Sequence, residues 1–115
     1  MAKIDFDKHV DGYTDGAAKA TYHREAKKRL RLLAKNLGLP AGTFDVRTNM
    51  AGPAVRGESV LHGERIYVMV GCMGGMLIRT CEGRKDYTGG PNHFANHNML
   101  DQPDELASLV KRIMG

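Results

Sequence analysis

The chain has 115 residues, the size of a single domain, because two halves would each be too small to bury a sound core. Its 42% hydrophobic and 26% charged residues are typical of a folded globular protein and exclude a disordered one. The apolar uncharged stretch at residues 66–78 is shorter than the roughly 20 residues of a membrane helix. No secretory signal is visible, and two cysteines make no disulfide framework, so we expect a cytoplasmic protein.

Positive charge is concentrated in one segment of the chain. The formal net charge is +4. Residues 19–35 contain seven Lys or Arg and one Glu, a net of +6, so the remaining residues together carry −2. An uneven charge distribution of this kind bears on the partners of a protein rather than on its fold.

The first predicted elements are an arm and a long helix. Residues 1–13 mix small apolar and charged side chains, and we interpret them as an arm, flexible or loosely packed. A helix is predicted from Thr14 or Asp15, which are good N-caps, to Leu37, with Gly38 as the residue that ends it. Its apolar stripe is Tyr22, Ala26, Leu30, Leu33 and Leu37. Five cations fall within about a 100° arc on the opposite face: Arg24, Lys27, Lys28, Arg31 and Lys35.

The middle of the chain predicts about four strands. Residues 44–50 alternate apolar and polar side chains, and residues 51–53 break the pattern. Residues 58–62 and 65–70 are predicted to be strands joined at 62–64, and residues 76–81 form a fourth after the turn 71–75. Strands this close in sequence are expected to pair antiparallel.

The end of the chain predicts a loop and a second helix. Residues 82–99 are irregular, and a loop of this length is more often functional or mobile than not. The last helix is expected to begin near Asp101 as N-cap, with an apolar stripe of Leu106, Leu109, Val110 and Ile113. The predicted fold class is therefore α+β, an antiparallel sheet of about four strands with an N-terminal and a C-terminal helix packed on one face.

The basic face of the first helix is the main candidate binding surface. Several cations along one face match the regular phosphates of a nucleic-acid backbone. The alternatives are a face that is simply solvated, since Glu25 and Arg29 already form a favourable helical pair, and an acidic protein partner. A homodimer without nucleic-acid binding is a further alternative, and no membrane partner is expected.

The loop before the last helix is a second candidate contact. Arg84, Lys85 and Tyr87, with His93 and Phe94, could contact and stack on single-stranded bases. The favoured interpretation is plainer: the loop folds back, and its aromatic side chains enter the core, where most aromatics lie.

No metal, cofactor or catalytic set is predicted. Cys72, Cys81, His93 and His97 are zinc-binding residue types, but the eight residues between the cysteines do not form a zinc knuckle. The predicted hairpin also holds the two cysteines too far apart for a disulfide. A Cys–His pair would need the fold to bring them together, so an enzymatic function is disfavoured without being excluded.

Two resemblances bear on function. The element order resembles a double-stranded-RNA-binding domain, but that family's final helix opens with lysines where this chain has Asp101, Asp104 and Glu105, so the assignment is not carried over. Residues 77–90, LIRTCEGRKDYTGG, resemble a block in uncharacterised small proteins of bacterial phages, plasmids and other mobile elements. This second resemblance implies an accessory role in a mobile element and brings no known activity. Taken together, the sequence predicts a small binding module that docks on nucleic acid.

Overall fold

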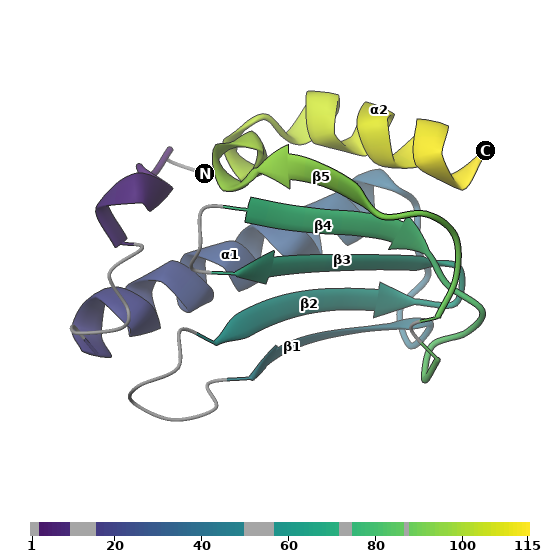
Figure 1. Cartoon of the computed structure of the whole chain (residues 1–115), viewed down its shortest axis with the longest axis horizontal. Helices are drawn as coiled ribbons and strands as arrows, with labels where there is room; N and C mark the ends of the chain where they lie inside the picture. Colours follow the sequence, from purple (N-terminus) through teal and green to yellow (C-terminus); the bar gives the residue numbers. More distant parts are fainter. Residues whose placement is uncertain (1–2, 10–15, 50–56, 72–74, 87) are drawn as a thin grey trace.

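A computed structural model describes residues 3–9, 16–49, 57–71, 75–86 and 88–115, and it shows an α+β fold. Five strands form one antiparallel sheet in the order β1-β2-β3-β4-β5. Both helices lie on one face of this sheet, and the described residues place no helix on the other (Figure 1). The predicted fold class is confirmed, with five strands in place of about four.

The strands follow the predicted alternation closely. Their bounds are β1 Phe44–Asn49, β2 Glu58–Gly63, β3 Ile66–Gly71, β4 Gly75–Thr80 and β5 His93–Asn96. In β3 every second side chain is buried, so this strand presents one face to the helices and the other away from them. Residues 50–56 and 72–74, where two of the predicted turns fall, lie outside the described residues.

The strand β5 contradicts the prediction of an irregular loop through residue 99. Its four residues pair with β4, from Gly75 opposite Asn96 to Ile78 opposite His93. The segment HFAN shows little apolar alternation, because three of its four side chains are exposed at the edge of the sheet. The free edge of β4 therefore determines this strand, and local sequence preference does not.

The helix α1, Gly16–Asn36, ends as predicted. Gly38 has a φ of +72°, and the Leu39 and Gly38 amides donate to the carbonyls of Ala34 and Lys35. This pair of hydrogen bonds is the Schellman arrangement, which needs a residue that tolerates positive φ. The predicted N-caps Thr14 and Asp15 lie outside the described residues. The predicted stripe is buried at Tyr22, Ala26, Leu30 and Leu33, and partly buried at Leu37.

The second helix, α2, begins later than predicted. It spans Pro103–Met114 and follows the short 3₁₀ helix η2, His97–Asp101. Gln102 occupies the N-cap position and makes no side-chain cap hydrogen bond there. Asp101 is not the cap, because its carboxylate accepts hydrogen bonds from the Arg29 guanidinium and the Ile4 amide.

Residues 3–9 do not behave as a loosely packed arm. They include the 3₁₀ helix η1, Phe6–His9, and the Phe6 side chain is fully buried. Its ring meets Tyr22 edge-on, with 5.3 Å between the ring centroids. The Phe6 amide donates to the side chain of Asn98, so this segment is tied to η2 as well as to α1.

Candidate functional site

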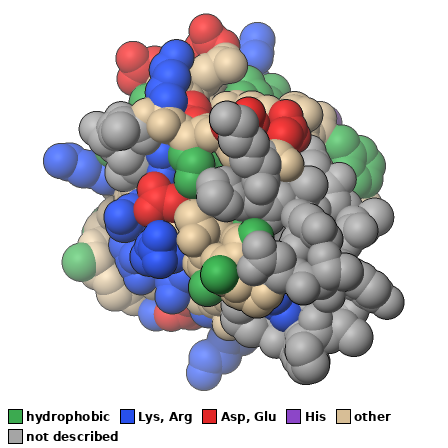
Figure 2. All heavy atoms as spheres, turned by 90° about the vertical axis from the view of Figure 1, so that its left-hand side faces the viewer, with side chains coloured by type: hydrophobic (Ala, Val, Ile, Leu, Met, Phe, Trp, Pro, Cys, Tyr) green, Lys and Arg blue, Asp and Glu red, His purple; other side chains and the backbone are tan. Residues whose placement is uncertain are grey.

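Four of the five predicted cations line one groove between α1 and β1. The groove encloses about 350 Å³. Its wall on α1 carries Arg24, Lys27, Lys28 and Arg31, and its wall on β1 carries Thr48. Figure 2, which views the end of the molecule where α1 begins, shows Lys and Arg side chains gathered in a cluster. The structure therefore places these four cations around one concavity, while Lys35 lies exposed one turn farther along and does not line it.

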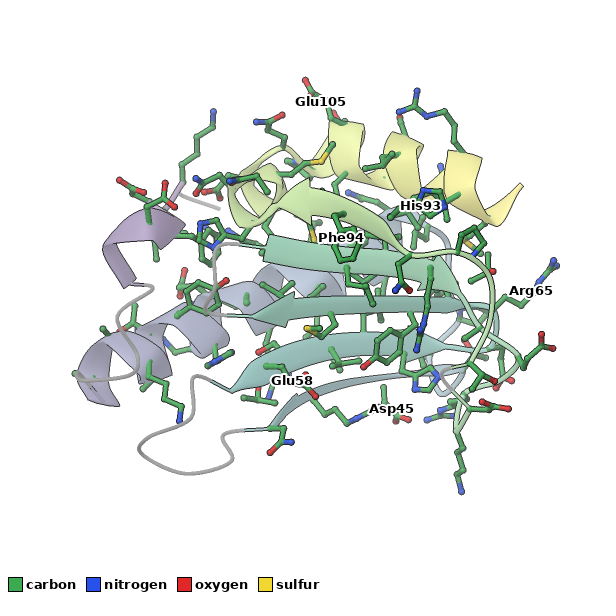
Figure 3. All side chains as sticks on the ribbon, in the orientation of Figure 1. Asp45, Glu58, Arg65, His93, Phe94 and Glu105 are labelled. Carbon is green, nitrogen blue, oxygen red and sulfur yellow. The ribbon has the colours of Figure 1, made fainter. Side chains whose placement is uncertain are left out.

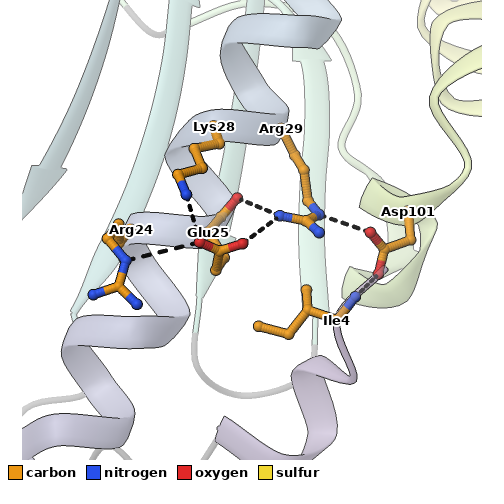
Figure 4. A network of polar contacts seen from close by, with 6 residues as sticks. All are labelled: Ile4, Arg24, Glu25, Lys28, Arg29 and Asp101. Carbon is orange, nitrogen blue, oxygen red and sulfur yellow. Dashed lines mark hydrogen bonds and ion pairs between the residues drawn. The ribbon is translucent and has the colours of Figure 1, made fainter. Parts of the chain in front are cut away.

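One acidic residue interrupts the positive face. Glu25 accepts a contact from Lys28 at 3.0 Å and from Arg24 at 3.7 Å (Figure 4). It also pairs with Arg29 at 3.0 Å. These cations, with the hydrogen bond from Lys28 as the largest cause, hold the pKa of Glu25 below its ordinary value. Part of the charge of Arg24 and Lys28 is thus balanced inside the protein.

Arg29 belongs to the structural core and not to the cation-lined groove. Its side chain is 1% exposed and bridges Glu25 and Asp101, with its Nε 2.7 Å from Asp101 Oδ1. Its guanidinium also lies 5.4 Å from the centre of the Phe6 ring. Arg29 therefore ties α1 to η1 and η2, and its charge is not available to a ligand.

Lys27 and Arg31 are the groove cations whose charge is least compensated. Neither forms an ion pair with any residue that the structure describes, and the same is true of Lys35. They lie four residues apart on α1, which places them on one side of the helix. A ligand with several negative charges would meet these two cations first.

Hydroxyl and imidazole groups lie beneath the cations. His23 lines the groove, and its Nδ1 is 2.9 Å from the Ser59 hydroxyl, which is 3.1 Å from the Thr48 hydroxyl. A Ser–His hydrogen bond is the arrangement of an activated nucleophile. Ser59, however, is completely buried, so this pair presents no reacting atom to a substrate.

The second predicted contact does not join this groove. The Arg84 guanidinium makes two hydrogen bonds to the Asp45 carboxylate, at 2.9 and 3.1 Å, and also donates to the carbonyls of Gly42 and Phe44. The hydrogen bonds from Arg84 lower the pKa of Asp45. Arg84 therefore fastens the loop after β4 to β1. Lys85 is exposed, and Tyr87 lies outside the described residues.

The expected burial of the loop aromatics is wrong for Phe94. This side chain is 76% exposed, and it lies on β5 at the sheet face away from the helices (Figure 3). The prediction failed because it placed Phe94 in a loop that folds back, whereas the residue is part of an edge strand whose pleat directs it outward.

The described members of the cysteine and histidine set, Cys81, His93 and His97, do not form a shared site. Cys81 is buried and its thiol donates to the carbonyl of Gly63, and burial raises the pKa of this thiol. His93 opens β5, whereas His97 is buried and contacts Tyr22 and Asp7. Within the described ranges, no three His, Cys, Asp or Glu side chains are placed to hold a metal ion. Cys72 lies outside them.

Sequence reasoning missed the β1 side of the groove. Thr48 and the buried Ser59 face α1 from neighbouring strands, opposite each other in the register. The alternation in residues 44–50 already places Thr48 on the same side as Val46, but the sequence does not show which helix covers that side.

Comparison with protein-family models, with curated proteins and with solved structures finds no match. None of the helices in the described part of the chain is long and apolar enough to cross a membrane.

Proposed function

We propose that this protein binds nucleic acid through the cation-lined groove between α1 and β1. The observation that supports the proposal is that Lys27 and Arg31, together with Arg24 and Lys28, line a single concave surface. A solvated face would need no such concavity. The resemblance of residues 77–90 implies a role in a mobile element, which is compatible with this function. That resemblance is the sole support for such a role.

The spacing of the cations suits a sugar–phosphate backbone. Residues 24–31 advance about 10.5 Å along α1, at about 1.5 Å per residue. Four cations over that length are about 3.5 Å apart on average, close to the axial spacing of about 3.4 Å between phosphates of one DNA strand. The Thr48 hydroxyl on the opposite wall could donate a further hydrogen bond to a phosphate oxygen.

No base-specific element is part of the described walls of this groove. The cations can neutralise phosphates, but the described residues that line the groove include no aromatic ring other than the imidazole of His23, which is 2% exposed. We therefore propose binding that depends on backbone charge and varies little with sequence.

The proposal is tested by fluorescence anisotropy with labelled DNA and RNA at two ionic strengths. The wild-type protein should bind at low salt and weaken steeply at high salt. A variant with Arg24→Glu, Lys27→Glu, Lys28→Glu and Arg31→Glu should show no binding, because its groove would repel phosphates. Circular dichroism must show that this variant is still folded.

A matched control separates the groove from the net charge. Lys3, Arg65, Lys111 and Arg112 are all exposed and lie outside the groove, and replacing them with Glu changes the net charge by the same amount. This control should keep most of the affinity. Equal loss in both variants, or no binding by the wild type at low salt, would show that the groove is not a nucleic-acid site. Salt-tolerant association with a protein would then favour the rival function.

A further inference from the structure

The sheet face that the helices leave open carries an apolar stripe across four strands. The register places Val60, Met69, Leu77 and Phe94 side by side, from β2 to β5. Phe94 is the most exposed of them, and Figure 3 shows it together with Glu58 on this face, with no helix in front. This surface lies on the opposite side of the sheet from α1, so it is separate from the basic groove.

A notch lies beside the stripe. An apolar groove of about 340 Å³ is lined by Met69, Gly71, Gly75, Leu77 and Phe94, with Glu58 at its margin. Gly71 follows Val70 in the chain, and Gly75 precedes Met76, the partner of Val70. The next position of this antiparallel register therefore places the two glycines opposite each other on β3 and β4.

Nothing inside the described chain requires glycine at these two positions. Neither has a positive φ. Among the described residues, a Cβ at Gly75 would meet no atom within 4 Å, and one at Gly71 would meet only Met69 Sδ, at 3.9 Å. Glycine weakens a strand and often marks a place where another chain approaches closely. A chain that enters the notch from outside would account for both glycines.

We propose that a second copy of this chain covers this face, with Phe94 of each subunit entering the glycine notch of the other. A projecting ring and a hollow of matching character lie on the same face, as a two-fold symmetric interface requires. The charges agree with this arrangement. Glu58 on β2 pairs with Gly71, and Arg79 on β4 pairs with Tyr67, so the two charges are four residues apart along the strand direction. They lie on opposite sides of Met69 on β3.

One two-fold axis satisfies both contacts. On a flat sheet with about 4.8 Å between strands and about 3.4 Å per residue, the midpoint between Glu58 and Arg79 is Met69. A two-fold axis that runs parallel to the sheet about 5 Å above that point, perpendicular to the line that joins the two residues, places Glu58 over the partner subunit's Arg79. The same rotation places Phe94 of the partner subunit within about 4 Å of Gly71 and Gly75 in projection. The ion pair and the inserted ring thus arise from a single geometry.

The size of the face limits the area that a dimer can bury. Five strands of about six residues cover at most roughly 500 Å² in projection, or about 1,000 Å² for both copies, and Val60 and His62 on this face are already buried. That area is at the lower limit for a specific interface, so we expect a weak, concentration-dependent dimer. A nucleic acid is a poorer occupant, since Arg47 and Arg79 on this face are accompanied by Glu58 and by an aliphatic stripe.

Sedimentation velocity over about 1–500 µM tests the dimer. The wild type should shift from monomer to dimer over this range. Phe94→Asp should raise the dissociation constant at least about tenfold, because a carboxylate cannot enter an apolar notch. Gly75→Val should do the same by filling the notch, and its Cβ would meet no described atom within 4 Å in the monomer. Wild type that stays monomeric throughout overturns the proposal.

A charge exchange identifies this particular interface. Glu58→Arg alone should weaken the dimer, and adding Arg79→Glu in the same chain should restore it, because each subunit then presents the reversed pair. Failure of the folded double variant to recover contradicts the proposed axis. If thermal melting shows that Arg79→Glu does not fold, Phe94→Asp and Gly75→Val remain decisive. DNA binding by a single groove should persist in the monomeric variants, so this inference and the proposed function can fail independently.

Discussion

His97 holds the beginning of the chain in place through hydrogen bonds on both ring nitrogens. Its Nε2 is 2.7 Å from an Asp7 carboxylate oxygen, and its Nδ1 is 2.9 Å from the Tyr22 hydroxyl. The same hydroxyl contacts the carbonyl of Gly71. His97 is completely buried, so its two contacts join η2 to η1 and to α1 inside the fold.

Asp7 makes the stability of this segment sensitive to acid. Hydrogen bonds from His97 and then Asn98 hold its pKa below the ordinary value of 3.8. A carboxyl with a lowered pKa stabilises the fold above its unfolded pKa, and this contribution is lost as the pH falls through the folded pKa. Asp7→Asn should therefore lower the melting temperature at pH 7, and the difference from wild type should shrink as the pH falls below 3.8 and through the lowered pKa of Asp7.

Thermal melts of both proteins from pH 7 to pH 2 check this prediction. Glu64→Gln, which removes an exposed carboxylate at a turn, is the control and should leave the profile nearly unchanged. A gap between Asp7→Asn and wild type that stays constant over the whole range would contradict the paired Asp7 and His97.

At the scale of elements, α1 performs two tasks on two faces. Leu30 is fully buried against the core, whereas Arg31, the next residue, is exposed and lines the groove. Leu30→Ala should cost about 2–5 kcal/mol of unfolding free energy, because it leaves a cavity. Arg31→Ala should change it by no more than about 0.5 kcal/mol. Urea unfolding measures both, and similar losses would mean that the two faces of α1 are not as separate as described.

The helices and strands whose hydrophobic periodicity is clear in the sequence could be predicted. The apolar stripe of α1 and the Gly38 end follow from the 3.6-residue repeat and one special φ, and β1 to β4 lie within about a residue of their predicted ends. The strand β5 could not be predicted, because its pairing depends on the free edge of β4. Arg29 carries a signal that sequence reasoning overlooked: it lies three residues after Ala26 and four before Leu33, on the buried stripe.

The whole molecule presents two unlike surfaces on opposite sides of one sheet. Behind the sheet, α1 concentrates cations, and those without an ion pair among the described residues are Lys27, Arg31 and Lys35. On the sheet face away from the helices, charged side chains of both signs lie beside an apolar stripe. The α1 half of the groove could be predicted from sequence, since helical spacing alone brings the cations together. The wall formed by Thr48 could not, because it depends on how β1 packs against α1.

The most direct measurement of the central claim is the salt dependence of DNA binding for wild type and for Lys27→Gln with Arg31→Gln. If all four groove cations meet phosphates, log K should fall against log salt with a slope of about −3.6 on duplex DNA. The double variant should have a slope shallower by about 1.8, while Lys111→Gln with Arg112→Gln on α2 should keep the wild-type slope. A slope that the groove substitutions leave unchanged, or that the α2 substitutions reduce equally, would contradict binding in the groove.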